Sequence, residues 1–398
     1  MRNTRKNRGI AGLESVVLGF CGGIVSNSEK CTGVVFMKSV ATGVRLLVGL
    51  ATCFSTFGVF AWQSPAGQGA AAADRSEQVV AAAAALLKVL SAEQQRAVQF
   101  RFNDDEQRVR WSNLPTGIFV RRGLRMGDLS EPQRQAVLEV IRATLSPAGY
   151  QAVLDNVAAD EQLKSGAGRG RIVFGSDEFY FSLLGEPSLQ EAWMWQFGGH
   201  HLAVNATVIG QRITLGPTLT GGQPMRYRAG ERSVSQMSAE ISAAAAFVKS
   251  LTDEQRSRAV LGGRYGDMLL GPGKDGVVPQ PEGLRGADLS AEQRQQLLSL
   301  VMLRVGLLND EDALERRAEL ERGLEDTWFS WRGAINAEGA SSYRVQGPAF
   351  FLEYAPQAMG GAPAEHIHAM YREFGNDYGQ RWFQESAGAG KSPSGERK

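Results

Sequence analysis

The chain is poor in cysteine, and its charges are almost balanced. Of its 398 residues three are cysteines, Cys21, Cys31 and Cys53, so the sequence beyond position 53 has no thiol. This excludes disulfide frameworks, cysteine nucleophiles and thiolate metal sites from that region and leaves His, Asp, Glu and Tyr as the strong metal ligands. Because 43 Lys and Arg face 42 Asp and Glu, the net charge of +1 gives no electrostatic reason to expect nucleic acid or an anionic membrane as partner.

Several familiar catalytic signatures are missing as well. The sequence contains no Walker loop, no Gly-x-Ser-x-Gly elbow and no His-Glu-x-x-His motif. A hydrophobic content of 43% with 21% charged residues is typical of a globular protein, and the length is sufficient for two domains with ordinary cores. Any activity therefore has to be sought in a less common arrangement of side chains.

The N-terminal region has the pattern of an export signal. A basic start at Met37-Lys38 precedes the apolar run 46–62, and a small-residue stretch ends at Ala70–Ala73. This order predicts a cleaved signal peptide over residues 37–73 and hence a periplasmic or extracellular protein that is free of the membrane after cleavage. The alternative is an uncleaved anchor helix, although the apolar run is shorter than the roughly 20 residues that a span needs. Residues 1–36 fit no part of the signal, so we interpret them as an over-extended gene start.

The region after the signal reads as an internal duplication. Gly123-Leu124-Arg125 returns as Gly283-Leu284-Arg285, and the segments around them return in the same order. We therefore predict two repeats, over residues 78–230 and 236–385, followed by a disordered tail over 386–398. Each repeat carries two capping boxes, which mark helix starts: Ser91–Gln94, Ser130–Gln133, Thr252–Gln255 and Ser290–Gln293.

Within each predicted repeat, helical sequence gives way to strand-like sequence. Apolar positions at helical spacing follow the second capping box, as in Val137, Leu138, Val140 and Ile141. Further along, β-branched and aromatic residues stand between glycines, which favours antiparallel strands. We expect an α+β fold of two similar lobes, in which helices pack on antiparallel sheet.

All four histidines fall in two clusters, His200-His201 and His366-Ile367-His368. Imidazole is the commonest protein ligand of transition metals, so two such clusters point to a metal or proton-transfer site. His366 and His368 face the same side of a strand and can hold one ion together. Adjacent His200 and His201 cannot both do so on a regular strand, so either Gly198-Gly199 forms a bulge or only one of the two is a ligand.

The remaining candidate ligand is Glu353. When the repeats are aligned at Leu202 and Leu352, Glu353 and His201 point to the same side of the corresponding strands. The predicted metal ligands at the junction of the repeats are thus His201, His366, His368 and Glu353, with His200 as a fifth ligand or an outer partner. Three or four histidines with one carboxylate suit a divalent transition metal such as Zn, Fe or Cu. His200 and Asp377 are the candidate catalytic groups for proton transfer. A cupin-like metal oxygenase is a variant of this hypothesis, because Gly360, His366, His368 and Glu373 follow the spacing of a cupin metal motif.

The region after the predicted signal resembles one known family. The residues that carry the resemblance are Trp195 to Asn205, Gln346-Gly347-Pro348, Phe351 to Tyr354, and His366-Ile367-His368 through to Gly379. This pattern resembles the family known as domain of unknown function 3500 over roughly residues 78 to 385. The resemblance implies an exported protein of the same fold and carries no activity, because that family is defined by sequence alone.

Two classes of function stay open at this point. The first is an exported metal-dependent hydrolase or oxidoreductase that acts on a small-molecule substrate. The second is a non-catalytic metal- or ligand-binding protein of the cell envelope. An open coordination position beside a pocket would favour the enzyme, and a fully protein-ligated ion would favour the binding protein.

Overall fold

The computed structural model describes residues 68–164, 171–263, 266–359 and 361–389. The segment interpreted as an extension (1–36) and all but the last residues of the predicted signal peptide (37–73) lie outside the described residues. The described chain begins inside a helix at Gln68, and its last helix ends at Ala389, four residues into the segment expected to be a disordered tail. Residues 390–398 of that tail also lie outside the described residues.

The protein is a mixed α+β structure, as predicted. The described helices follow the chain in this order: α1 (Gln68–Val89), α2 (Ala92–Val98), α3 (Asp105–Arg108), α4 (Glu131–Thr144), α5 (Pro147–Leu163), α6 (Ser238–Ser250), α7 (Asp253–Ala259), α8 (Ala291–Val305), α9 (Asp310–Arg322) and α10 (Gln380–Ala389). None of these helices is both long enough and apolar enough to span a bilayer.

The helix starts lie where the capping boxes place them. Ser91, Ser130, Thr252 and Ser290 each accept a hydrogen bond from the backbone three residues on, and the glutamine there binds back to the cap. Each box satisfies backbone N–H groups that the first helical turn leaves unpaired. The prediction of helix starts at these four positions is therefore confirmed.

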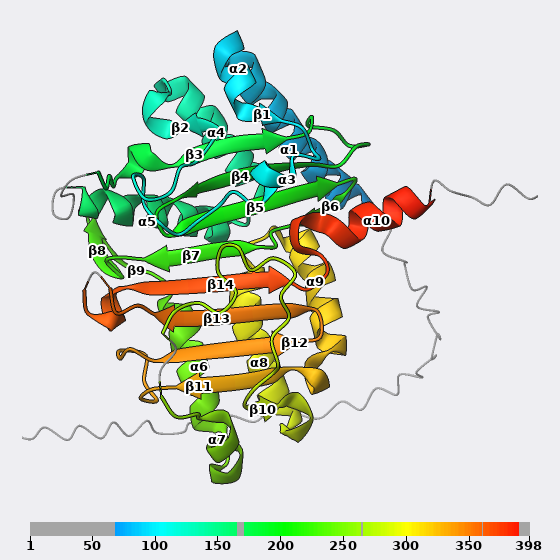
Figure 1. Ribbon diagram of the computed structural model, residues 1–398. Coiled ribbons are helices and arrows are strands. Elements are labelled where there is room, and N and C mark those ends of the chain that lie inside the picture. The colour runs from blue at the N-terminus through cyan, green and yellow to red at the C-terminus, as the bar shows by residue number, and fades with distance from the viewer. Residues whose placement is uncertain (1–67, 165–170, 264–265, 360, 390–398) are drawn as a thin grey trace, which may run out of the picture. The chain divides into compact units, whose positions relative to one another are not determined.

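The strands join in one large sheet that runs through both halves of the chain (Figure 1). Its order is β1-β3-β4-β5-β7-β14-β13-β12-β11-β10, with β2 beside β3 and β6 beside β5. The pairings are antiparallel except for the parallel pair β1–β3. The strands are β1 (Gln99–Phe100), β2 (Leu124–Arg125), β3 (Tyr180–Leu184), β4 (Trp193–Gly199), β5 (Leu202–Ile209), β6 (Arg212–Thr214), β7 (Thr218–Gly222), β10 (Leu284–Arg285), β11 (Trp328–Arg332), β12 (Ser342–Gly347), β13 (Phe350–Pro356) and β14 (Ile367–Glu373), and a separate hairpin consists of β8 (Arg226–Ala229) and β9 (Arg232–Ser235).

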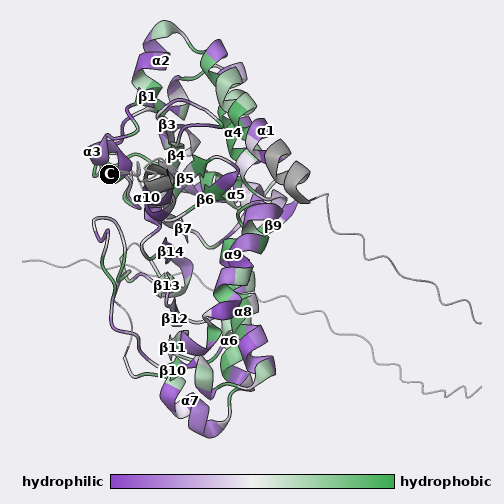
Figure 2. Cartoon of the chain, turned by 90° about the vertical axis from the view of Figure 1, so that its right-hand side faces the viewer, coloured by the Kyte–Doolittle hydropathy of each residue, from purple (hydrophilic) through white to green (hydrophobic). Residues whose placement is uncertain are grey.

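Most helices cover one face of the large sheet, whereas loops together with α3 and α10 cover the other (Figure 2). On the helix face, Trp195 and Phe197 of β4 pack with α1 and α4, whereas Phe329 and Val345 pack with α6 and α8. On the loop face, a smaller cluster combines strand residues with two aromatic residues of the covering segments, Trp111 and Tyr378. The strand residues are Leu184, Met194, Ala203, Leu219 and Met370. Because side chains alternate across a strand, both faces of the sheet are buried, and the central strands are apolar on each side.

One buried ion pair connects the helices to the middle of the sheet. The guanidinium of Arg304 on α8 donates two hydrogen bonds, of 2.9 and 2.7 Å, to the carboxylate of Glu240 on α6. A third hydrogen bond joins Arg304 to the hydroxyl of Thr220 on β7. The side chain of Arg304 is 2% exposed and that of Glu240 is 10% exposed. This geometry fixes two helices against the strand that joins the two halves of the sheet.

Candidate metal centre

Three of the four histidines meet at one point of the sheet. The Nε2 atom of His366 lies 2.8 Å from Nε2 of His201 and 3.2 Å from Nε2 of His368. One nitrogen from each ring lies within 4.8 Å of the other two, and all three side chains are buried. Within the described part of the chain, this is the one group of three or more His, Cys, Asp or Glu side chains with the spacing of metal ligands.

His201 reaches this point from the tight turn between β4 and β5. Gly199 and Leu202 face each other across the hairpin, so His200 and His201 form its two-residue tip. His201 has a φ of 60°, in the left-handed region that few residues other than glycine adopt. The turn directs the two adjacent rings differently, because His201 meets the histidines of β14 while His200 contacts helix α5. Only His201 therefore belongs to the three-histidine cluster, which consists of His201, His366 and His368.

The other two rings come from the start of β14, where they alternate with Ile367. The pairing of β14 with β7 places Gly221 opposite His368. A Cβ atom on Gly221 would lie 2.7 Å from the carbonyl oxygen of Ile367 and 3.1 Å from Cβ of His201. A glycine here leaves room for the ring of His201 to approach the two rings on β14.

Two of the ring nitrogens that face away from the cluster lie close to oxygen atoms. Nδ1 of His366 is hydrogen bonded to the carbonyl oxygen of Met359. Nδ1 of His368 makes no hydrogen bond among the described residues, and a carboxylate oxygen of Asp267 lies 3.5 Å from it. A hydrogen bond such as that of His366 holds an imidazole with Nδ1 protonated and Nε2 free to bind. Asn113 borders the cluster from the loop face, since its Nδ2 lies 3.4 Å from Nε2 of His368 and its carbonyl accepts a hydrogen bond from the backbone of His201.

His200 lies behind the cluster rather than in it. Its Nδ1 is 2.6 Å from a carboxylate oxygen of Asp160 on α5, and its ring centroid is 3.6 Å from that of His201. The second oxygen of Asp160 accepts a hydrogen bond from the backbone N–H of Gly175, and Phe174 packs against the ring of His200. His200 thus occupies the outer-partner position, one of the two that the sequence left open.

The structure does not bring Glu353 to the cluster. Its buried carboxylate accepts hydrogen bonds of 2.6 Å from Nε of Arg344 and from the backbone N–H of Leu269. Glu353 was predicted as a ligand because Leu202 was aligned with Leu352. Gly199 pairs with Leu202 and Gly347 with Phe350, so Leu202 corresponds in hairpin register to Phe350 and not to Leu352.

Asp377 is also held away from the histidines. One of its oxygens binds Arg372 at 2.9 Å, and the other accepts a hydrogen bond from the backbone of Glu373. Arg372 is in turn bound to Asp275 and to the carbonyls of Leu270 and Gly271. Asp377 is part of an ion-pair network that fixes a long loop to β14.

Burial keeps the three imidazoles of the cluster neutral. It lowers the pKa of His366 to about 4, against a partial opposing effect of the Met359 carbonyl. Burial and the neighbouring His200 hold the pKa of His201 well below its ordinary value, and burial also lowers the pKa of His368 although Asp267 counteracts it. Neutral imidazole is the form that binds a metal ion.

We expect the metal-free protein to lose stability as the pH falls from about 6.5 to 4. The pKa of His366 is lower in the folded than in the unfolded state. Its contribution to the stability of the fold is therefore fully present above the unfolded-state pKa and is lost as the pH falls through the folded-state pKa. At about 1.4 kcal/mol per pKa unit, this histidine alone contributes up to about 3 kcal/mol. Urea unfolding in EDTA at pH 7, 6, 5 and 4 measures the effect. The variant His366→Gln should show a flatter profile, and identical profiles for the two proteins would contradict the expectation.

Taken together, the fold and the geometry define an α+β protein with a buried three-histidine cluster of the kind that can hold a metal ion. The chain belongs to the family described as protein of unknown function (DUF3500), whose model matches residues 72–380. No curated protein and no solved structure matches it significantly.

Several residues around the cluster were not identified from the sequence. Asn113, Asp160 and Asp267 are polar residues without a distinctive local motif, and the part that Met359 plays is that of a backbone carbonyl. No local signal distinguishes Asp160, because α5 also contains Asp155 and Glu161. The others are brought to the site by long-range pairing that no local pattern encodes.

Proposed function

We propose that the three-histidine cluster binds one divalent transition metal ion through the Nε2 atoms of His201, His366 and His368. The observation that carries the proposal is the direction of the rings: three Nε2 atoms converge, while Nδ1 of His366 and Nδ1 of His368 are turned to a carbonyl and a carboxylate. Histidine ligands with such outer partners are characteristic of metal sites.

The spacing of the nitrogens fits a small ion. Zinc holds imidazole nitrogens at about 2.0–2.1 Å, which places tetrahedral ligands about 3.3 Å apart. The separations of 2.8 and 3.2 Å from Nε2 of His366 differ from this value by about 0.5 and 0.1 Å, and one nitrogen of each ring lies within 4.8 Å of the other two. Zn, Fe and Cu all accept imidazole ligands.

Three protein ligands are the number typical of catalytic zinc sites, in which water or substrate takes the remaining position. Such an ion supplies a Lewis acid that polarises a bound substrate or activates water. We therefore propose a metal-dependent hydrolase or oxidoreductase. His200, fixed by Asp160 and stacked on His201, is our candidate for the group that moves a proton there. Asp377 takes no part in this proposal because Arg372 holds it elsewhere.

A non-catalytic metal-binding protein is the second candidate function. The observation in its favour is the burial of the ligand residues, which are exposed by only 4% (His201), 8% (His366) and 4% (His368). A site that is closed to substrate would store the ion or strengthen the fold, and substrate turnover would be absent although the metal is bound.

Elemental analysis of the protein purified from its native compartment tests the metal. We expect about one transition metal ion per chain in the wild type and a loss of most of it in His368→Ala, because two imidazoles seldom hold an ion alone. Circular dichroism of both proteins controls for folding. A wild type without stoichiometric metal would contradict the proposal and would make a metal-free histidine acid–base site the better hypothesis.

We further propose that the two halves of the chain arose by duplication. Two features support this proposal. The helices α1, α4 and α5 recur in order as α6, α8 and α9. Outward from the β7–β14 pair, the strands follow in the order β5, β4, β3 on one side and β13, β12, β11 on the other. We also propose that the protein is exported through the signal peptide at 37–73, on the sequence pattern alone. N-terminal sequencing of the mature protein tests this, since an N-terminus before residue 61 would contradict it.

A further inference from the structure

The loop face of the sheet carries a row of three polar side chains in each half of the chain. Each row takes one residue from each of three neighbouring antiparallel strands, and the strand register places the two rows at corresponding positions. The members are Ser182, Gln196 and Asn205 in the first half and Ser330, Arg344 and Glu353 in the second. The first row has no ionisable side chain, whereas the second has an arginine and a glutamate.

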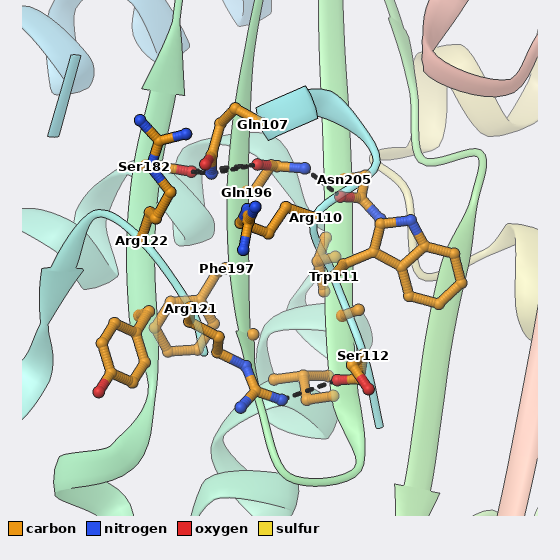
Figure 3. A pocket seen from close by; sticks show the side chains of 15 residues that line it. Gln107, Arg110, Trp111, Ser112, Arg121, Arg122, Ser182, Gln196, Phe197 and Asn205 are labelled. Atoms are coloured by element: carbon orange, nitrogen blue, oxygen red, sulfur yellow. Dashed lines mark hydrogen bonds between the residues drawn. The ribbon is translucent and has the colours of Figure 1, made fainter. Parts of the chain in front are cut away.

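In the first half, the covering segment fills the space above the row (Figure 3). Nε2 of Gln107 donates a hydrogen bond of 3.1 Å to Oε1 of Gln196, and Nε2 of Gln196 donates one of 2.9 Å to Oδ1 of Asn205. The side chains of Trp111 and Arg121 line the space that remains, which has a volume of about 20 Å³. Because a single water molecule needs roughly 10–15 Å³, this space has no room for an organic ligand.

In the second half, the corresponding space is open. A hollow of about 160 Å³ lies above the row, lined by strands β11, β12 and β13 and by the segment that precedes β10. A cavity of about 150 Å³ holds a benzene ring, so the hollow has room for one six-membered ring. Its rim is open to solvent, since Leu269 and Gln280 are exposed there. The polar side chains that line it are those of Gln280, Glu282, Ser330, Arg344 and Gln346.

The charged groups of the hollow are held in place by the protein itself. Nε of Arg344 donates a hydrogen bond of 2.6 Å to the carboxylate of Glu353, which also accepts one from the backbone N–H of Leu269. One oxygen of Glu282 accepts hydrogen bonds of 3.2 Å from Arg344 and of 3.3 Å from the hydroxyl of Ser330. Among the described lining residues, one arginine and one glutamate balance each other, so the hollow gives no electrostatic preference to a cation or an anion. It offers fixed hydrogen-bond donors and acceptors to a neutral molecule.

Two aromatic side chains also line the hollow. Trp328 is half-buried, and Phe351 is buried. Tyr180 and Ala203 stand at the corresponding register positions of the first half. A large aromatic ring beside fixed amide, carboxylate and guanidinium groups suits a pyranose ring. Such a sugar ring has an apolar face of C–H groups and a rim of hydroxyl groups that both donate and accept hydrogen bonds.

We propose that this hollow binds a neutral pyranose ring, with the C–H face of the sugar on Trp328 and its hydroxyl groups on Glu282, Arg344 and the amides of Gln280 and Gln346. The ring belongs either to a free monosaccharide or to the end of a glycan chain, since the two share the chemistry that the hollow recognises. None of the three histidines of the cluster lines the hollow, so the binding of the sugar does not depend on the proposed metal.

Ligand-observed NMR of the purified full chain in EDTA tests the proposal. The probes are glucose, galactose, mannose and N-acetylglucosamine, each as the free sugar and as its methyl glycoside. We expect saturation transfer to at least one of them, with a dissociation constant on the order of 1 mM, because a ligand of this size gains about 0.3 kcal/mol or more per non-hydrogen atom. A methyl glycoside bound as tightly as the free sugar indicates the end of a glycan, which is linked through the same carbon, and binding of the free sugar alone indicates a monosaccharide.

Trp328→Ala should weaken the binding of that sugar at least about tenfold, because it removes the ring on which the sugar packs. Tyr180→Ala is the matched control. It removes the half-buried aromatic residue at the corresponding position of the first half, beside a space that is too small for a sugar, and it should bind as the wild type does. Circular dichroism of both variants controls for folding.

A second variant keeps the test decisive if Trp328→Ala does not fold. Gln280→Ala removes an exposed side chain that makes no hydrogen bond to the described residues, and we expect it to weaken the binding about three- to tenfold. The proposal would be overturned if none of the probes bound, or if a folded Trp328→Ala or Gln280→Ala protein bound as the control does. Sugar binding that requires added zinc and disappears in His368→Ala would place the sugar on the metal, and would overturn the hollow while supporting the metal site.

Discussion

Replacing His366 by alanine is expected to weaken zinc binding by about a thousandfold or more, whereas replacing His200 by alanine should cost no more than about 10- to 100-fold. The first change removes the imidazole whose Nε2 lies closest to both of the others. The second removes a ring that stacks on His201 and binds Asp160 without joining the cluster. A factor of about 10 to 100 is usual for the loss of an outer partner of a metal site.

Competition against a fluorescent zinc chelator measures both affinities on the same scale. His200→Ala serves as the matched control, because it too removes one buried histidine from the same region of the fold. If the two variants lost affinity equally, the assignment of His366 as ligand and of His200 as outer partner would be wrong.

The variant Arg304→Met is expected to lower the free energy of unfolding by about 3–5 kcal/mol. Removing the arginine leaves the carboxylate of Glu240 buried without its partner, and an uncompensated buried charge is among the most destabilising changes in a protein. Urea unfolding at pH 7 followed by circular dichroism measures the loss.

The double variant Arg304→Met/Glu240→Leu separates the cost of the unpaired charge from the value of the pair. We expect it to recover most of the lost stability, since replacing both members of a buried pair by apolar groups is often close to neutral. A loss of less than about 1 kcal/mol in the single variant would show that water or another group reaches Glu240, against the burial described above.

The parts of the fold that the sequence predicted are those with a local physical cause. The four capping boxes depend on side chains three residues apart, and the helices begin where they predicted. β-Branched and aromatic residues between glycines predicted the strands around Trp195 and Phe351. No local pattern indicated the pairing of β7 with β14, which joins all these strands into one sheet. That contact is made between segments about 150 residues apart, and its register depends on the packing of both faces.

In the candidate site too, the sequence predicted the features that have a local cause and missed those that depend on long-range contacts. Spacing alone predicted that His366 and His368 share a face, and their Nε2 atoms indeed lie 3.2 Å apart. For His200 and His201, the alternation of side chains along a strand left two alternatives open, a bulge at Gly198-Gly199 or a single ligand. In the structure a two-residue turn directs the two rings, and His200 lies outside the cluster. Glu353 was misplaced because an alignment shifted by two residues preserves parity and so cannot be detected from alternation. Asn113 and Asp267 depended on loops whose paths the sequence did not reveal.

The site also has a consequence for the order in which the protein is assembled. His201 and His366 are separated by 165 positions in the chain, and they meet through the β7–β14 ladder. Contacts between such distant segments form late, because the entropy of closing a long loop must be offset by structure on both sides. An ion held by all three rings would then be acquired by a chain that has already folded, so chelators should strip it without preventing renaturation. This distinguishes the protein from small zinc modules, whose polypeptide collapses only around its metal.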